Sequence, residues 1–204
     1  MNSFVACSIF MEKFIKISGA GLAVLGTILL FLPKKWSHFV YYPTYLGIIF
    51  LVSAAVIFLP PMLFRKDTPQ KKKVILKMQT FLAISVLMNA AGELGLFQLY
   101  TVGFEYDKFV HLTTGLLFSI VFGEMLMVWK KLNFRQIIWP VVLMVLAGGV
   151  AWKIWESASD ILFHTQESGI YGQFITSDTF GDLLWGLLGI MYGLIFLKIT
   201  SWNI

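Results

Sequence analysis

The chain has 204 residues, of which 58% are hydrophobic and 13% are charged, and its mean hydropathy is +0.78. Soluble domains carry about 25% charged residues, so this composition excludes an ordinary water-soluble fold. Cys7 is the only cysteine, which excludes a disulfide framework and a thiolate metal site. The net charge of +5 follows the pattern of membrane orientation, and we therefore expect no nucleic-acid partner.

Apolar stretches recur along the whole chain, and each has roughly the 20 residues that a helix needs to cross a bilayer. We therefore predict an all-α, multi-pass membrane protein, a bundle of about six transmembrane helices embedded in the lipid bilayer. The predicted spans cover residues 14–32, 40–63, 74–100, 108–129, 136–160 and 179–198. Residues 1–13 are predicted to be an N-terminal extension, with either Met1 or Met11 as the start, and residues 14–204 a single transmembrane domain.

Prolines and glycines mark the limits and the packing of these predicted helices. Pro33 ends the first span and Pro60-Pro61 lie near the end of the second, because proline interrupts helical hydrogen bonding. The segments GAGLAVLG (19–26) and GLLGIMYG (186–193) place glycines on helix faces. Glycines on a helix face allow close helix packing in membranes, so we expect tight contacts at both segments.

Basic residues are concentrated on one side of the predicted membrane. With six spans, one side carries Lys13, Lys16, Arg65, Lys66, Lys71, Lys72, Lys73, Lys77, Lys130, Lys131, Arg135 and Lys198. The opposite side carries only Lys34, Lys35 and Lys108. Cytoplasmic loops are rich in lysine and arginine, so we predict that both termini are cytoplasmic.

Acidic residues show the opposite distribution. Glu12, Asp67 and Glu124 lie on or near the cytoplasmic side, and the others fall in the outer half or the outer loops. Four predicted helices each carry a polar pair spaced four residues apart near the outer end: Asn89 and Glu93, Asp107 and His111, Glu156 and Asp160, and Asp178 and Asp182. Residues four apart share one helix face, so the pairs predict one polar pocket that opens to the outside.

Each pair also has a purely structural explanation. Asp178 and Asp107 each suit the start of a helix, where the helix dipole favours an acid. Glu156 lies near a helix C-terminus, which the dipole disfavours, but Lys153 is three residues away and allows an intrahelical ion pair. A single histidine such as His111 is most often a hydrogen-bonded interior residue. The functional interpretation therefore depends on the convergence of several pairs.

Charges inside a membrane are costly and are usually paired or functional. The six acids of the four polar pairs have only Lys108 and Lys153 as nearby bases. Either several carboxyl groups hold protons, or a divalent cation such as Mg²⁺, Mn²⁺, Ca²⁺ or Zn²⁺ lies among them. The candidate metal ligands are Asp107, His111, Glu156, Asp160, Asp178 and Asp182, and the candidate acid–base residues are His111, Glu93 and Glu156.

Three ordered motifs resemble a known family. The segments YDKFVHLTTG (106–115), WESASD (155–160) and SDTFGDLLWGLLG (177–189), within residues 85–195, resemble the YjdF-type family of bacterial inner-membrane proteins. The D-K-x-x-H arrangement is also similar, more weakly, to that of VanZ-like proteins. The resemblance implies a bacterial plasma-membrane location and supplies motifs without a mechanism.

The sequence leaves three functions open. The first is a metal-dependent membrane enzyme acting on a lipid or lipid-linked envelope substrate, where the cation activates water or holds phosphate oxygens. The second is a proton- or cation-coupled transporter that uses the same acids as a relay. The third is a binding or scaffold protein in which an ion site holds the helices together.

Overall fold

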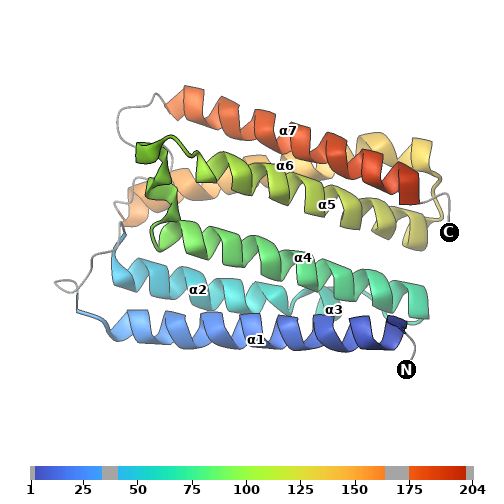
Figure 1. Cartoon of the computed structure of the whole chain (residues 1–204), viewed down its shortest axis with the longest axis horizontal. Coiled ribbons are helices and arrows are strands. Elements are labelled where there is room, and N and C mark those ends of the chain that lie inside the picture. The colour runs from blue at the N-terminus through green and yellow to red at the C-terminus, as the bar shows by residue number, and fades with distance from the viewer. Residues whose placement is uncertain (1–2, 34–40, 164–174, 201–204) are drawn as a thin grey trace. The chain divides into compact units, whose positions relative to one another are not determined.

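The computed structural model describes residues 3–33, 41–163 and 175–200, and every regular element in these ranges is helical. Figure 1 shows the elements in chain order. They are α1 (Ser3–Phe31), α2 (Pro43–Ile57), α3 (Pro60–Leu63), α4 (Pro69–Glu93), the 3-10 helix η2 (Leu96–Val102), α5 (Tyr106–Lys130), α6 (Phe134–Phe163) and α7 (Ile175–Thr200). The predicted all-α class is confirmed.

Helices α1, α4, α5, α6 and α7 are long and apolar enough, by length and composition, to cross a membrane. Many of their large apolar side chains are exposed, including Phe31, Trp139 and Phe196, as expected for surfaces that contact lipid. The apolar helix α2 has only 15 residues. At the helical rise it covers about 22 Å, which is less than the roughly 30 Å of a bilayer core. The protein is therefore a multi-pass membrane protein with five helices long enough to cross, and α2 is a shorter apolar helix.

Two predicted helix ends are wrong, and both errors have a local cause. The predicted span 40–63 is interrupted because α2 ends at Ile57 and Pro60 begins the separate turn α3. Proline fits the first turn of a helix but not its interior. The predicted span 74–100 continues too far, since α4 ends at Glu93. Gly95 follows with φ +135°, a conformation that only glycine adopts readily.

Residues 3–13 of the predicted extension lie within α1. The predicted orientation of both termini stays a prediction, and the outer-side residues Lys34 and Lys35 lie outside the described residues. Contacts between helices divide the chain into two compact units, residues 1–99 and 100–204. This division leaves the predicted single domain over residues 14–204 as a prediction.

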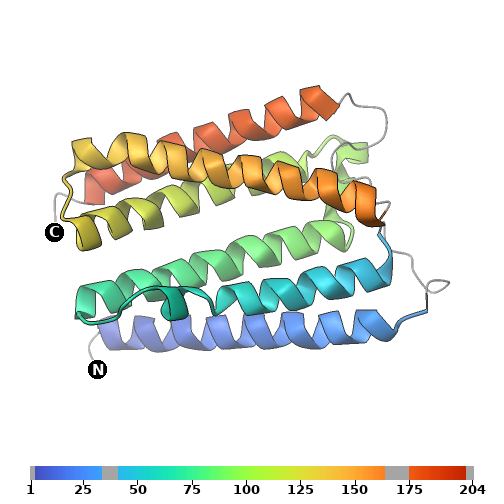
Figure 2. The same ribbon diagram turned by 180° about the vertical axis from the view of Figure 1, so that it is seen from behind.

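The first unit contains α1, α2, α3 and α4. Helices α1 and α2 make its most extensive contact, and α4 packs on both of them (Figure 2). Gly26 and Gly47 face each other where α1 and α2 meet, and a Cβ on either glycine would lie within 3 Å of the other residue's carbonyl oxygen. The tight contact predicted for GAGLAVLG is thus present at Gly26.

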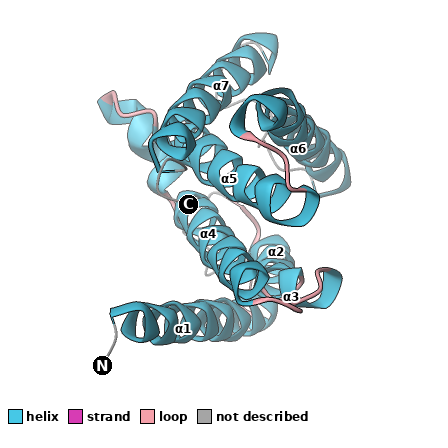
Figure 3. Cartoon of the chain, turned by 90° about the vertical axis from the view of Figure 1, so that its right-hand side faces the viewer, coloured by secondary structure: helices cyan, strands magenta, loops and turns pink. Residues whose placement is uncertain are grey.

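The second unit contains α5, α6 and α7, which Figure 3 shows as neighbours seen nearly end-on. The contact between α5 and α7 is the most extensive, and glycines allow it. A Cβ on Gly115 would collide with the carbonyl of Gly186, and a Cβ on Gly189 with the backbone of α5 at Leu112. Asn133, the residue before α6, caps the start of this helix together with Gln136. Gln136 N donates to Asn133 Oδ1, and Asn133 N donates to Gln136 Oε1.

Candidate functional site

Charged side chains of the second unit gather at one end of its helices. Because α6 runs opposite to α5 and α7, the beginning of α5, the later part of α6 and the beginning of α7 meet at the same end (Figure 1). We call the side chains that are joined there by ion pairs the charged cluster: Asp107, Lys108, His111, Lys153, Glu156, Asp178 and Asp182.

Asp182 lies at the centre of the charged cluster and is only 1% exposed. The Lys108 ammonium, from α5, donates to Asp182 Oδ1 at 2.5 Å and to Asp178 Oδ1 at 2.8 Å. The Lys153 ammonium, from α6, pairs with Asp182 Oδ2 and donates to Glu156 Oε2 at 2.5 Å. One carboxylate of α7 therefore joins lysines from two other helices.

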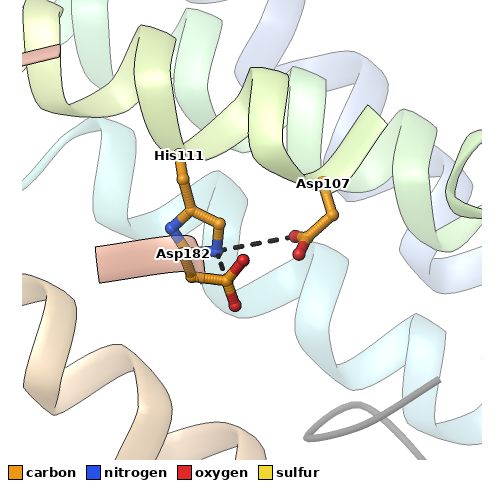
Figure 4. Close-up of side chains that lie close together, drawn as sticks. All are labelled: Asp107, His111 and Asp182. Carbon is orange, nitrogen blue, oxygen red and sulfur yellow. Dashed lines mark ion pairs between the residues drawn. The ribbon is translucent and has the colours of Figure 1, made fainter. Parts of the chain in front are cut away.

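His111 completes a group of three residues of the types that bind metal ions. Its Nε2 atom lies 3.5 Å from Asp107 Oδ1 and 3.6 Å from Asp182 Oδ2, as Figure 4 shows. One donor atom from each of Asp107, His111 and Asp182 lies within 4.8 Å of the other two. Asp107 and His111 are four residues apart on α5, so the helical repeat alone brings them to one face, and α7 supplies Asp182.

The Oδ2 atom of Asp182 has charged neighbours but no hydrogen bond. The Lys153 ammonium and the His111 ring are both within ion-pair distance, yet no donor in the described part of the chain points along a hydrogen-bonding direction at Oδ2. The two observations agree because an ion pair requires only proximity, whereas a hydrogen bond also requires alignment. This buried oxygen is therefore held by ion pairs with Lys153 and His111.

The formal charge of the charged cluster is negative. Its four carboxylates, Asp107, Glu156, Asp178 and Asp182, outnumber its two lysines by two, so the net charge is −2 when His111 is neutral. All four acids are half-buried or buried. The charge excess of the charged cluster is smaller than the sequence predicted, because Glu93 and Asp160 are not among its ion-paired acids.

Two of the remaining predicted site residues, Asp160 and Glu93, are not members of the converging trio. Asp160 is half-buried on α6, one turn after Glu156, and is not one of the three residues whose donor atoms converge. Glu93 belongs to the first unit, where it is 3% exposed at the end of α4 and its Oε1 accepts a hydrogen bond from Asn89 at 3.3 Å. Asn89 and Glu93, which are four residues apart on α4, thus interact with each other along one helix face.

The sequence indicated Lys108 and Lys153 as bases near the acids, but neither lysine is among the predicted site residues. The intrahelical pair of Lys153 with Glu156 followed from their spacing, and the structure contains it. The pairing of Lys108 with Asp178 and Asp182 joins residues 70 and 74 positions apart. No local signal in the sequence indicates such a long-range pairing.

The fold and the charged cluster define a multi-pass α-helical membrane protein in which α5, α6 and α7 share a buried group of acids and bases. Residues 18–203 match the family described as "Predicted membrane protein (DUF2238)", and the chain belongs to that family. No curated protein and no solved structure matches the chain significantly. The more specific likenesses to YjdF-type and VanZ-like proteins stay predictions.

Proposed function

We propose that the protein is a divalent-cation-dependent membrane enzyme that acts on a lipid or lipid-linked envelope substrate at the outer face of the bacterial plasma membrane. The observation that carries this proposal is the convergence of Asp107, His111 and Asp182, with donor atoms within 4.8 Å of one another, in a cluster of charge −2. One divalent cation would balance that charge.

Two carboxylates and one imidazole suit a catalytic metal site. Such donors bind Zn²⁺, Mn²⁺ or other divalent first-row ions, and a site with three protein ligands leaves a position open for water or substrate. A cation there would polarise a substrate oxygen or lower the pKa of a bound water molecule. The burial of Asp182 Oδ2 beside His111 supports this location.

Nearby residues would supply proton transfer and orientation. Glu156 is 7% exposed and contacts Lys153, which contacts the trio through Asp182, so Glu156 is our proposed acid–base residue. With His111 assigned to the metal, its alternative role as acid or base becomes secondary. Asp178, bound by Lys108, would orient that lysine, and Asp160 and Glu93 retain their predicted roles only as expectations from the sequence.

The place of the charged cluster along the helices supports a lipid-linked substrate. Asp107 and Asp178 lie in the first turns of α5 and α7. Membrane helices begin near the boundary between the hydrocarbon core and the headgroups, so the cluster would lie at the depth of a lipid headgroup. A substrate held by its lipid tail would present its polar head at this depth.

Metal binding is tested by titrating the purified protein in detergent with Mn²⁺ and following the free-ion signal by electron paramagnetic resonance. We expect one Mn²⁺ per chain, and we expect Asp182→Asn and Asp107→Asn each to weaken binding at least about tenfold, since second-shell losses alone already reach that size. Asp67→Asn is the matched control, because this exposed acid pairs only locally with Lys71.

Absence of Mn²⁺ and Zn²⁺ binding to the folded wild-type protein would contradict the proposal. If the cation binds, turnover is sought with phospholipid and polyprenyl-phosphate-linked substrates, with and without chelator. Cation binding without turnover of either class would leave the enzyme proposal unsupported and would favour a structural ion site.

A structural role is the second candidate, and one observation favours it. Lys108 of α5 and Lys153 of α6 both bind Asp182 of α7, so the charged cluster joins the helices even without a cation. A transport relay receives less support. The sequences 112–123, 136–152 and 183–197, which separate the cluster from the other helix ends, contain no charged residue.

A further inference from the structure

Lys153 occupies the same oxygen that the proposed cation requires. Its ammonium pairs with Asp182 Oδ2, and this is the Asp182 oxygen that lies 3.6 Å from His111 Nε2. Lys108 instead binds the other oxygen, Oδ1, together with Asp178. Lys108 also lies 3.6 Å from Asp107 Oδ2, whereas His111 faces Asp107 Oδ1. A cation held by Asp107 Oδ1, His111 and Asp182 Oδ2 would therefore compete with Lys153 for an oxygen, while Lys108 contacts the other oxygen of each carboxylate.

The competition has a clear electrostatic outcome. A divalent ion and an ammonium group on one carboxylate oxygen would repel each other strongly in a buried site. Lys153 would keep Glu156 as its close partner, with Asp178 Oδ2 at 3.9 Å, and would present its remaining donors beside the cation. Cation binding would thus convert Lys153 from a counter-ion of Asp182 into an available cationic donor.

We propose that Lys153, released from Asp182 by the bound cation, is the binding residue for a phosphoryl group of the substrate, so that phosphate binds only after the cation. This inference rests on the proposed function and names its substrate class as a phosphate ester. Lysine is a common phosphate ligand that acts as a point charge, and a divalent cation shares phosphate oxygens with it.

Charge balance imposes the order of binding. Without a cation the charged cluster has a net charge of −2, which repels a phosphate anion. With one divalent cation the net charge of the charged cluster is zero. The cation and the Lys153 ammonium would then be two neighbouring positive groups. Because linkage is reciprocal, phosphate must then strengthen cation binding by the same factor.

The experiment repeats the Mn²⁺ titration in the presence of inorganic phosphate or of a short-chain phosphatidic acid, with protein-free micelles as the blank. We expect either anion to raise the Mn²⁺ affinity of the wild-type protein about tenfold, within the usual range of coupling between sites. An effect of phosphatidic acid alone would indicate a lipid headgroup, and an effect of both would indicate the phosphoryl group itself.

Lys153→Met is the most informative variant, because it should have opposite effects on the Mn²⁺ affinity measured without phosphate and on the increase of that affinity by phosphate. Without the competing ammonium, Mn²⁺ alone should bind more tightly than to wild type, while the enhancement by phosphate should disappear. Lys153→Arg keeps the cation and should retain the enhancement, which guards against a folding defect of Lys153→Met. Lys108→Met removes an equal charge from the other oxygen and should keep the enhancement.

The outcomes separate the two proposals. If the wild-type protein binds no Mn²⁺, the proposed function fails and this inference fails with it. If Mn²⁺ binds but neither anion changes its affinity, the metal site stands and the phosphate inference is wrong. Equal enhancement in wild type and in Lys153→Met would also overturn the assignment of Lys153.

Discussion

At the scale of single residues, the charged cluster shows how a membrane helix tolerates buried charge. Asp182 is fully buried, and it is stabilised by ammonium groups that reach it from two neighbouring helices. Breaking a buried ion pair by removing one partner is costly, because the other charge is left uncompensated. Each charged side chain of the cluster is therefore tolerated only because its partners are present.

Ser159 differs from this pattern, and its hydroxyl provides a residue-scale prediction. It lies on α6 one turn after Glu156 and is 1% exposed, but its Oγ atom has no hydrogen-bond partner in the described part of the chain. We expect Ser159→Ala to leave the thermal unfolding midpoint in detergent unchanged or raised, because no hydrogen bond is lost and an unsatisfied polar group is removed.

Ser119 is the matched control for this measurement. It is also fully buried, but its Oγ donates to Leu116 O at 2.9 Å, so Ser119→Ala should lower the midpoint by an amount corresponding to about 1 kcal/mol. A clear loss of stability in Ser159→Ala would show that the hydroxyl has a partner, such as an ordered water molecule or a ligand of the site.

At the scale of elements, the contact between α5 and α7 determines the geometry of the charged cluster. The glycines of the two helices let the backbones approach closely, which in turn brings Asp182 within 3.6 Å of His111. Small residues have this role in many membrane bundles, since close backbones increase the dispersion contact between helices. The glycine segment and the charged cluster are thus parts of one arrangement.

Gly189→Ala tests this dependence. A Cβ at Gly189 would collide with the carbonyl of Leu112, one residue after His111. We expect a destabilisation of about 1–3 kcal/mol, as for an overpacked core, together with weaker Mn²⁺ binding. The measurements are the thermal midpoint and the metal titration.

Gly186→Ala is the control within the same helix, because a Cβ there has no atom within 4 Å. We expect equal or slightly higher stability, since alanine is favoured over glycine in a helix interior by up to about 1 kcal/mol. If both variants behave alike, close packing at Gly189 does not control the position of Asp182.

At the scale of the whole molecule, the number of membrane crossings depends on α2. Five helices are long enough to cross, and α2 has 15 residues followed by the single turn α3. If α2 crosses as well, the N-terminus and the loop between α3 and α4 lie on the same side of the membrane. The excess of lysine and arginine in that loop favours this arrangement.

Cysteine accessibility tests the crossing of α2. The native Cys7 is exposed near the start of α1, and a single cysteine can be placed at Lys66 or Glu105 in a Cys7→Ser background. With six crossings, an impermeant maleimide should label Cys7 and Lys66→Cys only from the cytoplasmic side and Glu105→Cys only from outside. Labelling of Cys7 and Lys66→Cys from opposite sides would show that α2 does not cross.

The sequence by itself determined the class of the protein and indicated which residues are available to form the candidate site. Apolar run length and overall composition were sufficient for an all-α membrane fold, because bilayer thickness dictates helix length directly. The spacing of four residues was sufficient to place Asp107 with His111 on one helix face, because helical geometry is local. Helix ends were less predictable where Pro60 and Gly95 interrupt apolar runs that remain hydrophobic.

The tertiary structure decided which of these residues meet. Asp182 joins Asp107 and His111 in the converging trio while Asp160 does not, and Lys108 pairs with acids 70 and 74 positions away. These outcomes depend on the rotation and axial offset of α5, α6 and α7 relative to one another. Glycine contacts bring α5 and α7 close together, and the sequence pattern of any single helix contains no information about its offset relative to the others.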